Sequence, residues 1–170
     1  DLSRLAYLGS TKLIALKSLG KDEREELIES GKAEEMSVRE LKEKIKEHLL
    51  KRGFSVEDLG TYSEESVDYP VYGKACGEAV ASGKANLGVV ICGTGIGISI
   101  AANKIKGIRC GLCTSVEMAH LTKQHNNANI LALGGRTTGV DLAVKIVDEW
   151  LDTEYEGGRH QRRVEMLDRM

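Results

Sequence analysis

The chain has 170 residues and a formal net charge of −2, with 24 Lys and Arg against 26 Asp and Glu. This length suits one domain with a well-developed core, and the near-neutral charge argues against nucleic acid or a membrane surface as a partner. No apolar run approaches the roughly 20 residues that span a bilayer, and no signal-peptide pattern is found. The four cysteines lie in strand-like or helix-like contexts, which favours free thiols and a cytoplasmic location.

The pattern becomes regular from residue 37 onward. The expected elements, in chain order, are helix 37–53, strand 54–59, helix 69–82, strand 87–91, helix 98–104, strand 108–113, helix 114–124, strand 130–133, helix 140–151 and a polar helix 159–169. Ser37 with Glu40, and Thr114 with Glu117, form capping boxes that predict two of the helix starts. Gly53 is expected to end the first helix.

The first 36 residues form a divergent segment. Lys12–Leu16 is a candidate for a first strand, and Lys21–Glu29 is a candidate surface helix that ends at Gly31. No internal repeat or low-complexity linker divides the rest of the chain. We therefore expect residues 37–170 to form one domain.

Strands that alternate with helices predict an α/β fold. The expected architecture is a single-domain open parallel sheet with helices on both faces, a Rossmann-like three-layer sandwich. Ligands bind such sheets beyond the carboxyl ends of the strands. Cys92, Thr114 and Arg136 each follow an expected strand, so the sequence predicts one shared site at that edge.

The segment from Cys92 to Gly97, with the sequence Cys-Gly-Thr-Gly-Ile-Gly, carries the strongest functional signal. It follows a buried strand and precedes a helix, so its backbone N–H groups and the helix dipole form a cradle for negative charge. A helix N-terminus also favours the thiolate form of a neighbouring cysteine, which is the reactive form. This segment therefore predicts a base or nucleophile, Cys92, beside a site for a developing oxyanion.

Other interpretations of this turn are weaker. A plain tight connection does not need three alternate glycines. A dinucleotide site normally has G-x-G-x-x-G after the first strand and an acidic residue at the end of the next strand. Here the spacing is G-x-G-x-G, the turn comes late in the chain, and the next strand ends at Cys113-Thr114.

Three further patterns have a simple structural explanation. Cys110-x-x-Cys113 is half of a zinc site, and an offset of three in a strand puts the sulfurs on opposite faces, which favours two buried thiols. His125 lies just after an expected helix and, like His120, is an ordinary surface or core histidine unless its loop reaches the rim of the site. Arg159 and Arg163 share one side of the last helix, as a solvated basic face or as a phosphate-binding pair.

About three-quarters of the chain resembles the B-type ribose-5-phosphate isomerase family, which also contains galactose-6-phosphate isomerase. The matching stretches, in the family's order, are Gly60-Thr61-Tyr62-Ser63, Asp68-Tyr69-Pro70, 91–104, Gly107-Ile108-Arg109, 125–129 and 156–163. The resemblance implies an aldose–ketose isomerase that acts on a phosphorylated sugar. It also implies a homodimer or tetramer with sites between subunits, and neither metal nor organic cofactor.

The resemblance implies a role for each matched site residue. Cys92 would be the base that moves a proton between C1 and C2, and Thr94 with the turn's backbone N–H groups would hold the enediolate. His125 would help to open the furanose ring. The implied substrate-binding residues are Tyr69, Gly93, Gly95, Gly97, Asn126, Arg136, Arg159 and Arg163.

The resemblance ends at the amino side. Family members carry an Asp-His pair after their first strand, and the corresponding residues here are Glu35-Met36. Two hypotheses therefore remain: an active isomerase of ribose 5-phosphate or of a six-carbon sugar phosphate such as allose or galactose 6-phosphate, or a non-catalytic relative that binds a sugar phosphate or serves as a scaffold. The Cys-Gly-Thr-Gly and Gly-Gly-Arg-His motifs occur in one chain, which favours ribose 5-phosphate.

Overall fold

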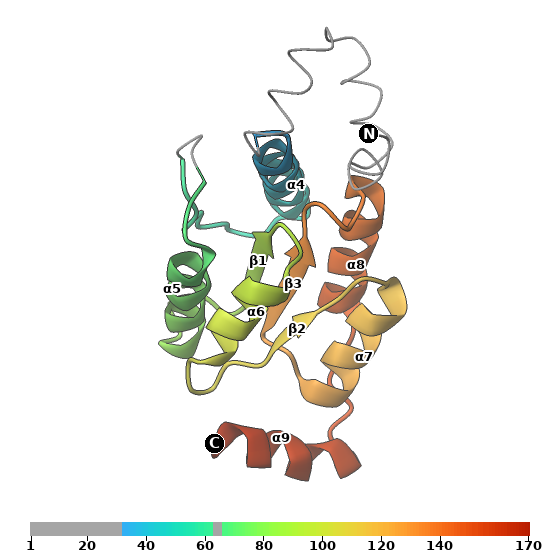
Figure 1. The fold of residues 1–170 in the computed structure, drawn as a ribbon. Coiled ribbons are helices and arrows are strands. Elements are labelled where there is room, and N and C mark those ends of the chain that lie inside the picture. Colours follow the sequence, from blue (N-terminus) through green and yellow to red (C-terminus); the bar gives the residue numbers. More distant parts are fainter. Residues whose placement is uncertain (1–31, 63–65) are drawn as a thin grey trace, which may run out of the picture.

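The computed structural model describes residues 32–62 and 66–170. Within these ranges, β1 (Gly88–Cys92), β2 (Cys110–Leu112) and β3 (Ile130–Gly134) form a parallel sheet in the order β1-β3-β2 (Figure 1). Each strand lies close to its predicted position, although β2 is shorter than expected. The candidate strand Lys12–Leu16 and the candidate helix Lys21–Glu29 lie outside the described residues.

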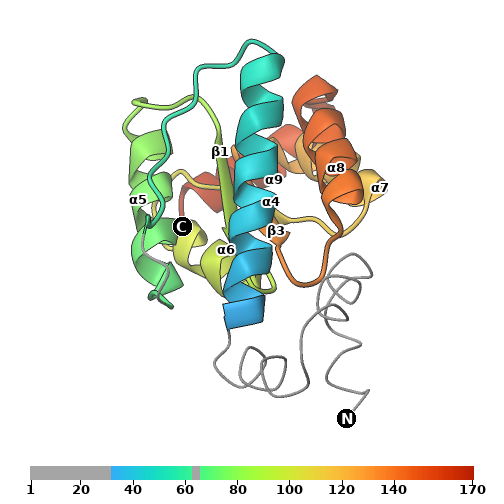
Figure 2. The same cartoon turned by 90° about the horizontal axis from the view of Figure 1, so that it is seen from above.

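Helices cover both faces of this sheet (Figures 1 and 2). One face carries α4 (Lys32–Lys51), α7 (Val116–Asn126) and α8 (Val140–Asp152), and the other carries α5 (Tyr69–Ala81) and α6 (Ile96–Asn103). The predicted three-layer α/β architecture is therefore confirmed. None of the helices in the described ranges combines the length and apolar character needed to cross a membrane.

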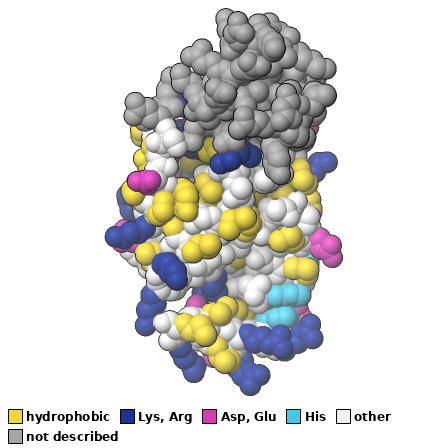
Figure 3. Space-filling view, in the orientation of Figure 1, with side chains coloured by type: hydrophobic (Ala, Val, Ile, Leu, Met, Phe, Trp, Pro, Cys, Tyr) yellow, Lys and Arg dark blue, Asp and Glu magenta, His cyan; other side chains and the backbone are white. Residues whose placement is uncertain are grey.

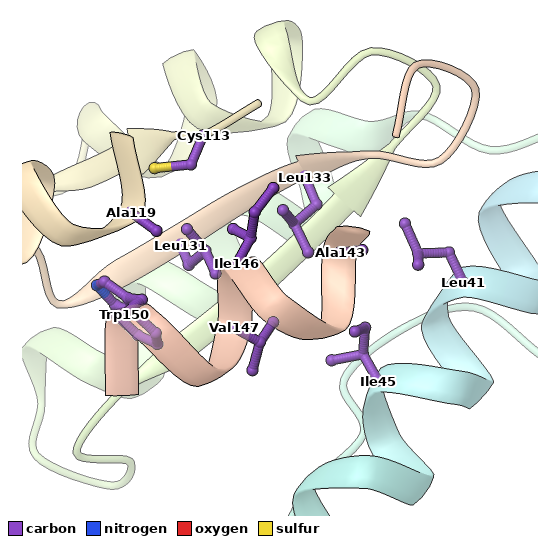
Figure 4. Close-up of a cluster of buried hydrophobic side chains, with 10 residues drawn as sticks. All are labelled: Leu41, Ile45, Cys113, Ala119, Leu131, Leu133, Ala143, Ile146, Val147 and Trp150. Atoms are coloured by element: carbon purple, nitrogen blue, oxygen red, sulfur yellow. The ribbon is translucent and has the colours of Figure 1, made fainter. Parts of the chain in front are cut away.

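The central strand β3 separates two hydrophobic clusters. All five of its residues are buried, and successive side chains point to opposite faces. Leu131 and Leu133 pack with Ile146 and Trp150 of α8 (Figure 4), whereas Ile130 packs on the side of α5 and α6. A strand buried on both faces explains why its sequence is continuously apolar rather than alternating.

Two predicted helix starts are wrong. Helix α4 begins at Lys32 rather than at Ser37, because the residues that precede Ser37 include strong helix formers and continue the helix backwards. Helix α7 is capped by Ser115 rather than by Thr114, since the Ser115 side chain accepts the Met118 N–H. Both capping-box patterns therefore lie near a helix start without marking it.

The expected strand at 54–59 is also wrong. This segment connects α4 to α5 but forms no ladder with any described strand. It is held instead by Asp58, whose carboxylate accepts the Gly60 N–H and pairs with Lys42 and Lys46 of α4. Alternating apolar residues indicate a strand only where a neighbouring strand can complete the hydrogen bonds.

A short carboxyl-terminal arm follows α8. Gly157 and Gly158 both have positive φ and redirect the chain into the 3₁₀ turn η1 (Gly158–His160) and helix α9 (Gln161–Asp168). In Figure 1, α9 lies below the edge of the sheet at which the strands begin. Arg109 fastens it there through an ion pair with Asp168.

Candidate functional site

The loops that follow β1 and β3 are joined at the carboxyl edge of the sheet. Cys92 ends β1 and lies opposite Gly134 in the parallel register. Beyond this pair, Gly135 N–H donates to the Cys92 carbonyl at 2.8 Å, and Arg136 N–H donates to the Gly93 carbonyl at 2.9 Å. The structure thus brings Cys92 and Arg136 to one edge, as predicted from their positions after buried strands, and Thr114 follows β2 at the same edge.

The Cys92 thiol faces the start of α6. Gly95 N–H donates a hydrogen bond to Cys92 Sγ at 3.2 Å, and the Thr94 hydroxyl accepts the Ile96 N–H at 3.3 Å. Gly95 is the N-cap residue and has a φ of 78°, a left-handed conformation that glycine adopts without strain. A donated N–H and the positive end of the α6 dipole therefore both face this sulfur.

Two other glycines of the turn leave room for neighbouring side chains. A Cβ at Gly93 would lie 2.5 Å from Cζ of Arg136, so the guanidinium lies against the backbone beside Cys92. A Cβ at Gly97 would lie 2.6 Å from the Tyr69 hydroxyl oxygen, so the ring lies against the first turn of α6. We call Cys92, Thr94, Tyr69, Arg136 and the glycine turn the thiol cluster.

The remaining three cysteines have different surroundings. Cys110 and Cys113 belong to hydrophobic clusters on opposite faces of the sheet, as expected, but only Cys113 is fully buried, whereas Cys110 is partly buried. Burial raises the pKa of Cys76 and of Cys113 to about 11, and that of Cys110 to about 12. These three thiols are therefore almost fully protonated at neutral pH.

This difference predicts selective alkylation. At pH 7, iodoacetamide should modify Cys92 at least about tenfold faster than the other three cysteines, because thiolate is the reacting form and the pKa values of the other three thiols are raised. Peptide mass spectrometry after a short exposure measures the four rates. Denatured protein is the control, in which all four should react at similar rates, and equal labelling in the folded protein would contradict the prediction.

A second group of polar residues lies at the end of α7. His125 and Asn126 are its last two residues, and Asn127 caps it in a left-handed conformation. The His125 ring is stacked on the His160 ring, with centroids 4.1 Å apart and planes 9° apart. The Glu156 carboxylate lies 3.8 Å from His125 Nε2 and 3.9 Å from His160 Nε2.

Arginines complete this group from the carboxyl-terminal arm. Arg159 Nε donates to His160 Nε2 at 3.3 Å, and Arg163 lies one turn later on the exposed side of α9. We call His125, Asn126, Glu156, Arg159, His160 and Arg163 the histidine cluster. Arg159 lies in the 3₁₀ turn η1 and Arg163 in α9, so the expected helix does not begin at Arg159, and the two arginines do not belong to one α-helix.

The two clusters occupy opposite edges of the sheet within one chain. Cys92 follows the end of β1, whereas α7 runs back from the end of β2 to the beginning of β3, so its last residues, His125 and Asn126, lie where the strands begin. Figure 1 shows α9 at that same edge. One chain therefore does not bring His125, Arg159 and Arg163 to Cys92.

The sequence-based prediction assigns no role to three residues in or beside the histidine cluster: Glu156, His160 and Arg109. His160 and Glu156 lie in the stretch 156–163 that resembles the family. Their contacts with His125 join positions more than 30 residues apart, and no periodic pattern in the sequence indicates such contacts. Arg109 connects the end of α7 to α9, since its Nε donates to the Asn126 and Asn127 carbonyls and its NH1 pairs with Asp168. An arginine at the start of a strand gives no sign of this role.

Comparison with known proteins identifies the family. Residues 33–167 match the family model described as Ribose/Galactose Isomerase. Ribose-5-phosphate isomerase B of Escherichia coli strain K12 is 53% identical over 127 residues, covering 75% of this chain and 85% of that protein. Galactose-6-phosphate isomerase subunit LacB of Clostridium acetobutylicum is 46% identical over 127 residues, covering 75% of this chain and 73% of that protein.

A solved structure agrees with both relatives. Ribose-5-phosphate isomerase B of Clostridium thermocellum superimposes with a TM-score of 0.76 at 54% identity, covering 77% of this chain and 88% of that chain. Identity at this level extends the likeness from the fold to the family. The chain belongs to the ribose/galactose isomerase family, in its B-type ribose-5-phosphate isomerase branch, and is an isomerase enzyme of that family.

Proposed function

We propose that the protein interconverts ribose 5-phosphate and ribulose 5-phosphate through an enediolate, with Cys92 as the base. The hydrogen bond from Gly95 N–H to Cys92 Sγ at the start of α6 carries the proposal. A thiolate held there can remove the proton from C2 of the open-chain aldose, and the resulting thiol can return a proton to C1. Cysteine suits this transfer because its pKa can be tuned towards the working pH.

The same turn supplies stabilisation for the intermediate. Loss of the C2 proton moves negative charge onto the carbonyl oxygen, and preorganised donors lower the energy of that oxyanion. The Thr94 hydroxyl oxygen already accepts the Ile96 N–H, so its own proton can be donated to the substrate. The Arg136 guanidinium against Gly93 adds positive charge, and Tyr69 lines the same side.

The histidine cluster supplies the rest of the site from a second subunit. We propose that His125 promotes opening of the furanose ring, Asn126 binds sugar hydroxyls, and Arg159 with Arg163 binds the phosphate. Both arginines are exposed in the isolated chain, and planar guanidinium groups suit a phosphate dianion. The binding energy of the phosphate holds the reacting carbons in place.

An apolar surface supports the homodimer that this arrangement requires. Ile96 and Ile100 of α6, and Met118 and Leu121 of α7, are all exposed. Figure 3 shows hydrophobic side chains gathered over this face of the molecule. A two-fold contact through this surface buries α6, whose N-cap residue Gly95 donates to the Cys92 thiol, and brings a partner subunit to the thiol cluster.

The proposal also covers the cofactors, the cellular location and the part of the chain that carries the activity. The reaction needs neither metal nor organic cofactor, because thiol, imidazole and guanidinium groups cover the proton transfers and the charge. All four cysteines are free, which suits a reducing cytoplasm. We propose that residues 37–170 act as one domain and that the family's Asp-His pair is replaced or dispensable.

Direct turnover measurements test this function. Ribose 5-phosphate should be converted to ribulose 5-phosphate at a rate that exceeds turnover of allose 6-phosphate and galactose 6-phosphate by at least about tenfold, the usual discrimination in a pocket shaped for one substrate. Preference for galactose 6-phosphate would instead support the activity of the LacB relative. Binding of all three sugar phosphates without turnover would support the non-catalytic alternative.

A further inference from the structure

His160 lies at the centre of the histidine cluster and is almost fully buried, with 6% of its surface exposed. One face of its ring is stacked on His125, and its Nε2 accepts a hydrogen bond from Arg159 Nε. Its backbone N–H donates to the Gly157 carbonyl, which fixes the ring's position after the two left-handed glycines. A single side chain therefore contacts both the proposed ring-opening group and a proposed phosphate-binding group.

We propose that His160 is a positioning residue that couples His125 to Arg159. The stacked face holds the His125 ring in the orientation needed for proton transfer, and the Nε2 lone pair holds the Arg159 guanidinium towards the phosphate. The inference rests on the proposed function for its consequences in catalysis, but its structural part is measurable without substrate.

The charges around His160 support this assignment. The pKa of His160 is lowered, first by burial and then by the cations that face it, His125, Arg159 and Arg163, while Glu156 acts in the opposite direction. Since Nε2 accepts from Arg159, the neutral ring carries its proton on Nδ1. A lowered pKa favours the neutral ring of His160, which keeps the Nε2 lone pair available to Arg159.

The same atoms are less suited to a metal ion. His125, Glu156 and His160 have ligand atoms within 4.8 Å of one another. However, Arg159 already donates to the Nε2 lone pair of His160, and two parallel stacked rings do not direct their lone pairs at a common point. The adjacent guanidinium groups favour an anion at this place instead.

Two substitutions separate the two contacts of His160. H160F keeps a ring against His125 but removes the acceptor for Arg159, so KM for the sugar phosphate should rise about tenfold while kcat changes little. H160Q keeps an acceptor for Arg159 but removes the ring, so kcat should fall about tenfold to a hundredfold while KM changes little. H120Q is the matched control, because His120 lies on α7, the helix that carries His125, but pairs with Glu149 instead of His160. Parallel losses of kcat and KM in both variants would overturn the proposal.

NMR of the imidazole resonances tests the structural part alone. As pH falls, His160 should protonate only below the pH range usual for histidine, because burial and the neighbouring cations lower its pKa. The His125 ring proton should keep its upfield ring-current shift in H160F and lose it in H160Q, with no change in H120Q. If His160 titrates at or above the usual pH range of histidine, or if H160Q leaves the His125 resonance unchanged, the inference fails whether or not the protein is an isomerase.

Discussion

Replacing Cys92 with alanine is expected to lower kcat for ribose 5-phosphate by about 10²–10⁴-fold, the usual range for a lost general base. The effect should fall on kcat rather than on KM, because the thiol acts on the C2 proton while the phosphate and the hydroxyls are bound by other groups. Initial rates of ribulose 5-phosphate formation, measured over a range of substrate concentrations, give kcat and KM separately.

The matched control for this substitution is C110A. Cys110 is also a free cysteine of the same sheet, at the start of β2, but desolvation raises the pKa of its partly buried thiol to about 12, so it cannot act as a base at neutral pH. We expect C110A to keep kcat within about twofold of the unsubstituted protein, since no transition-state contact is lost. An unchanged kcat in C92A would refute the assignment of the base.

Replacing Arg159 with alanine is expected to raise KM by about tenfold to a hundredfold. A hydrogen bond to a charged group contributes about 1.5–3 kcal/mol, and a phosphate that keeps its charge throughout the reaction is bound similarly before and during proton transfer. Steady-state kinetics and binding of inorganic phosphate by calorimetry should both report the loss.

R169A is the control for the arginine substitution. Arg169 follows α9, is exposed, and pairs with Glu165 rather than with the histidine cluster. Its removal takes away the same charge from the same arm, so KM should remain within about twofold if position rather than charge decides binding. A fall in kcat alone in R159A would show that the guanidinium does not bind the phosphate.

The sequence predicts the parts of this fold that depend on local and sheet-wide patterns. β3 can be recognised in the sequence because a continuous apolar run is typical of a strand that is buried on both faces. α8 can be recognised because its apolar residues recur at helical spacing. The strand at 54–59 is wrong for the complementary reason: its alternation is real, but Asp58 and its lysine partners hold the segment where no described strand can pair with it.

The site is predictable at the thiol cluster and less so at the histidine cluster. Cys92 and Arg136 follow strands, so the parallel topology alone brings them to one edge. His125 and Arg159 also follow from motif and spacing, but their separation from Cys92 follows only from the direction in which α7 returns. The stacking of His125 on His160 joins residues with no sequence periodicity between them, so only the folded arm reveals it.

Mixing two variants that are each impaired at low substrate concentration tests the central claim most directly. If each site takes Cys92 from one subunit and Arg159 from its partner, a heterodimer of C92A and R159A subunits contains one site with both groups intact and one with neither. Half of randomly re-formed dimers are then mixed, so activity at low substrate concentration should recover to about a quarter of that of the unsubstituted protein. If mixing restores nothing while mixed dimers are detected by native mass spectrometry, the thiol and histidine clusters do not form one site across the subunit interface.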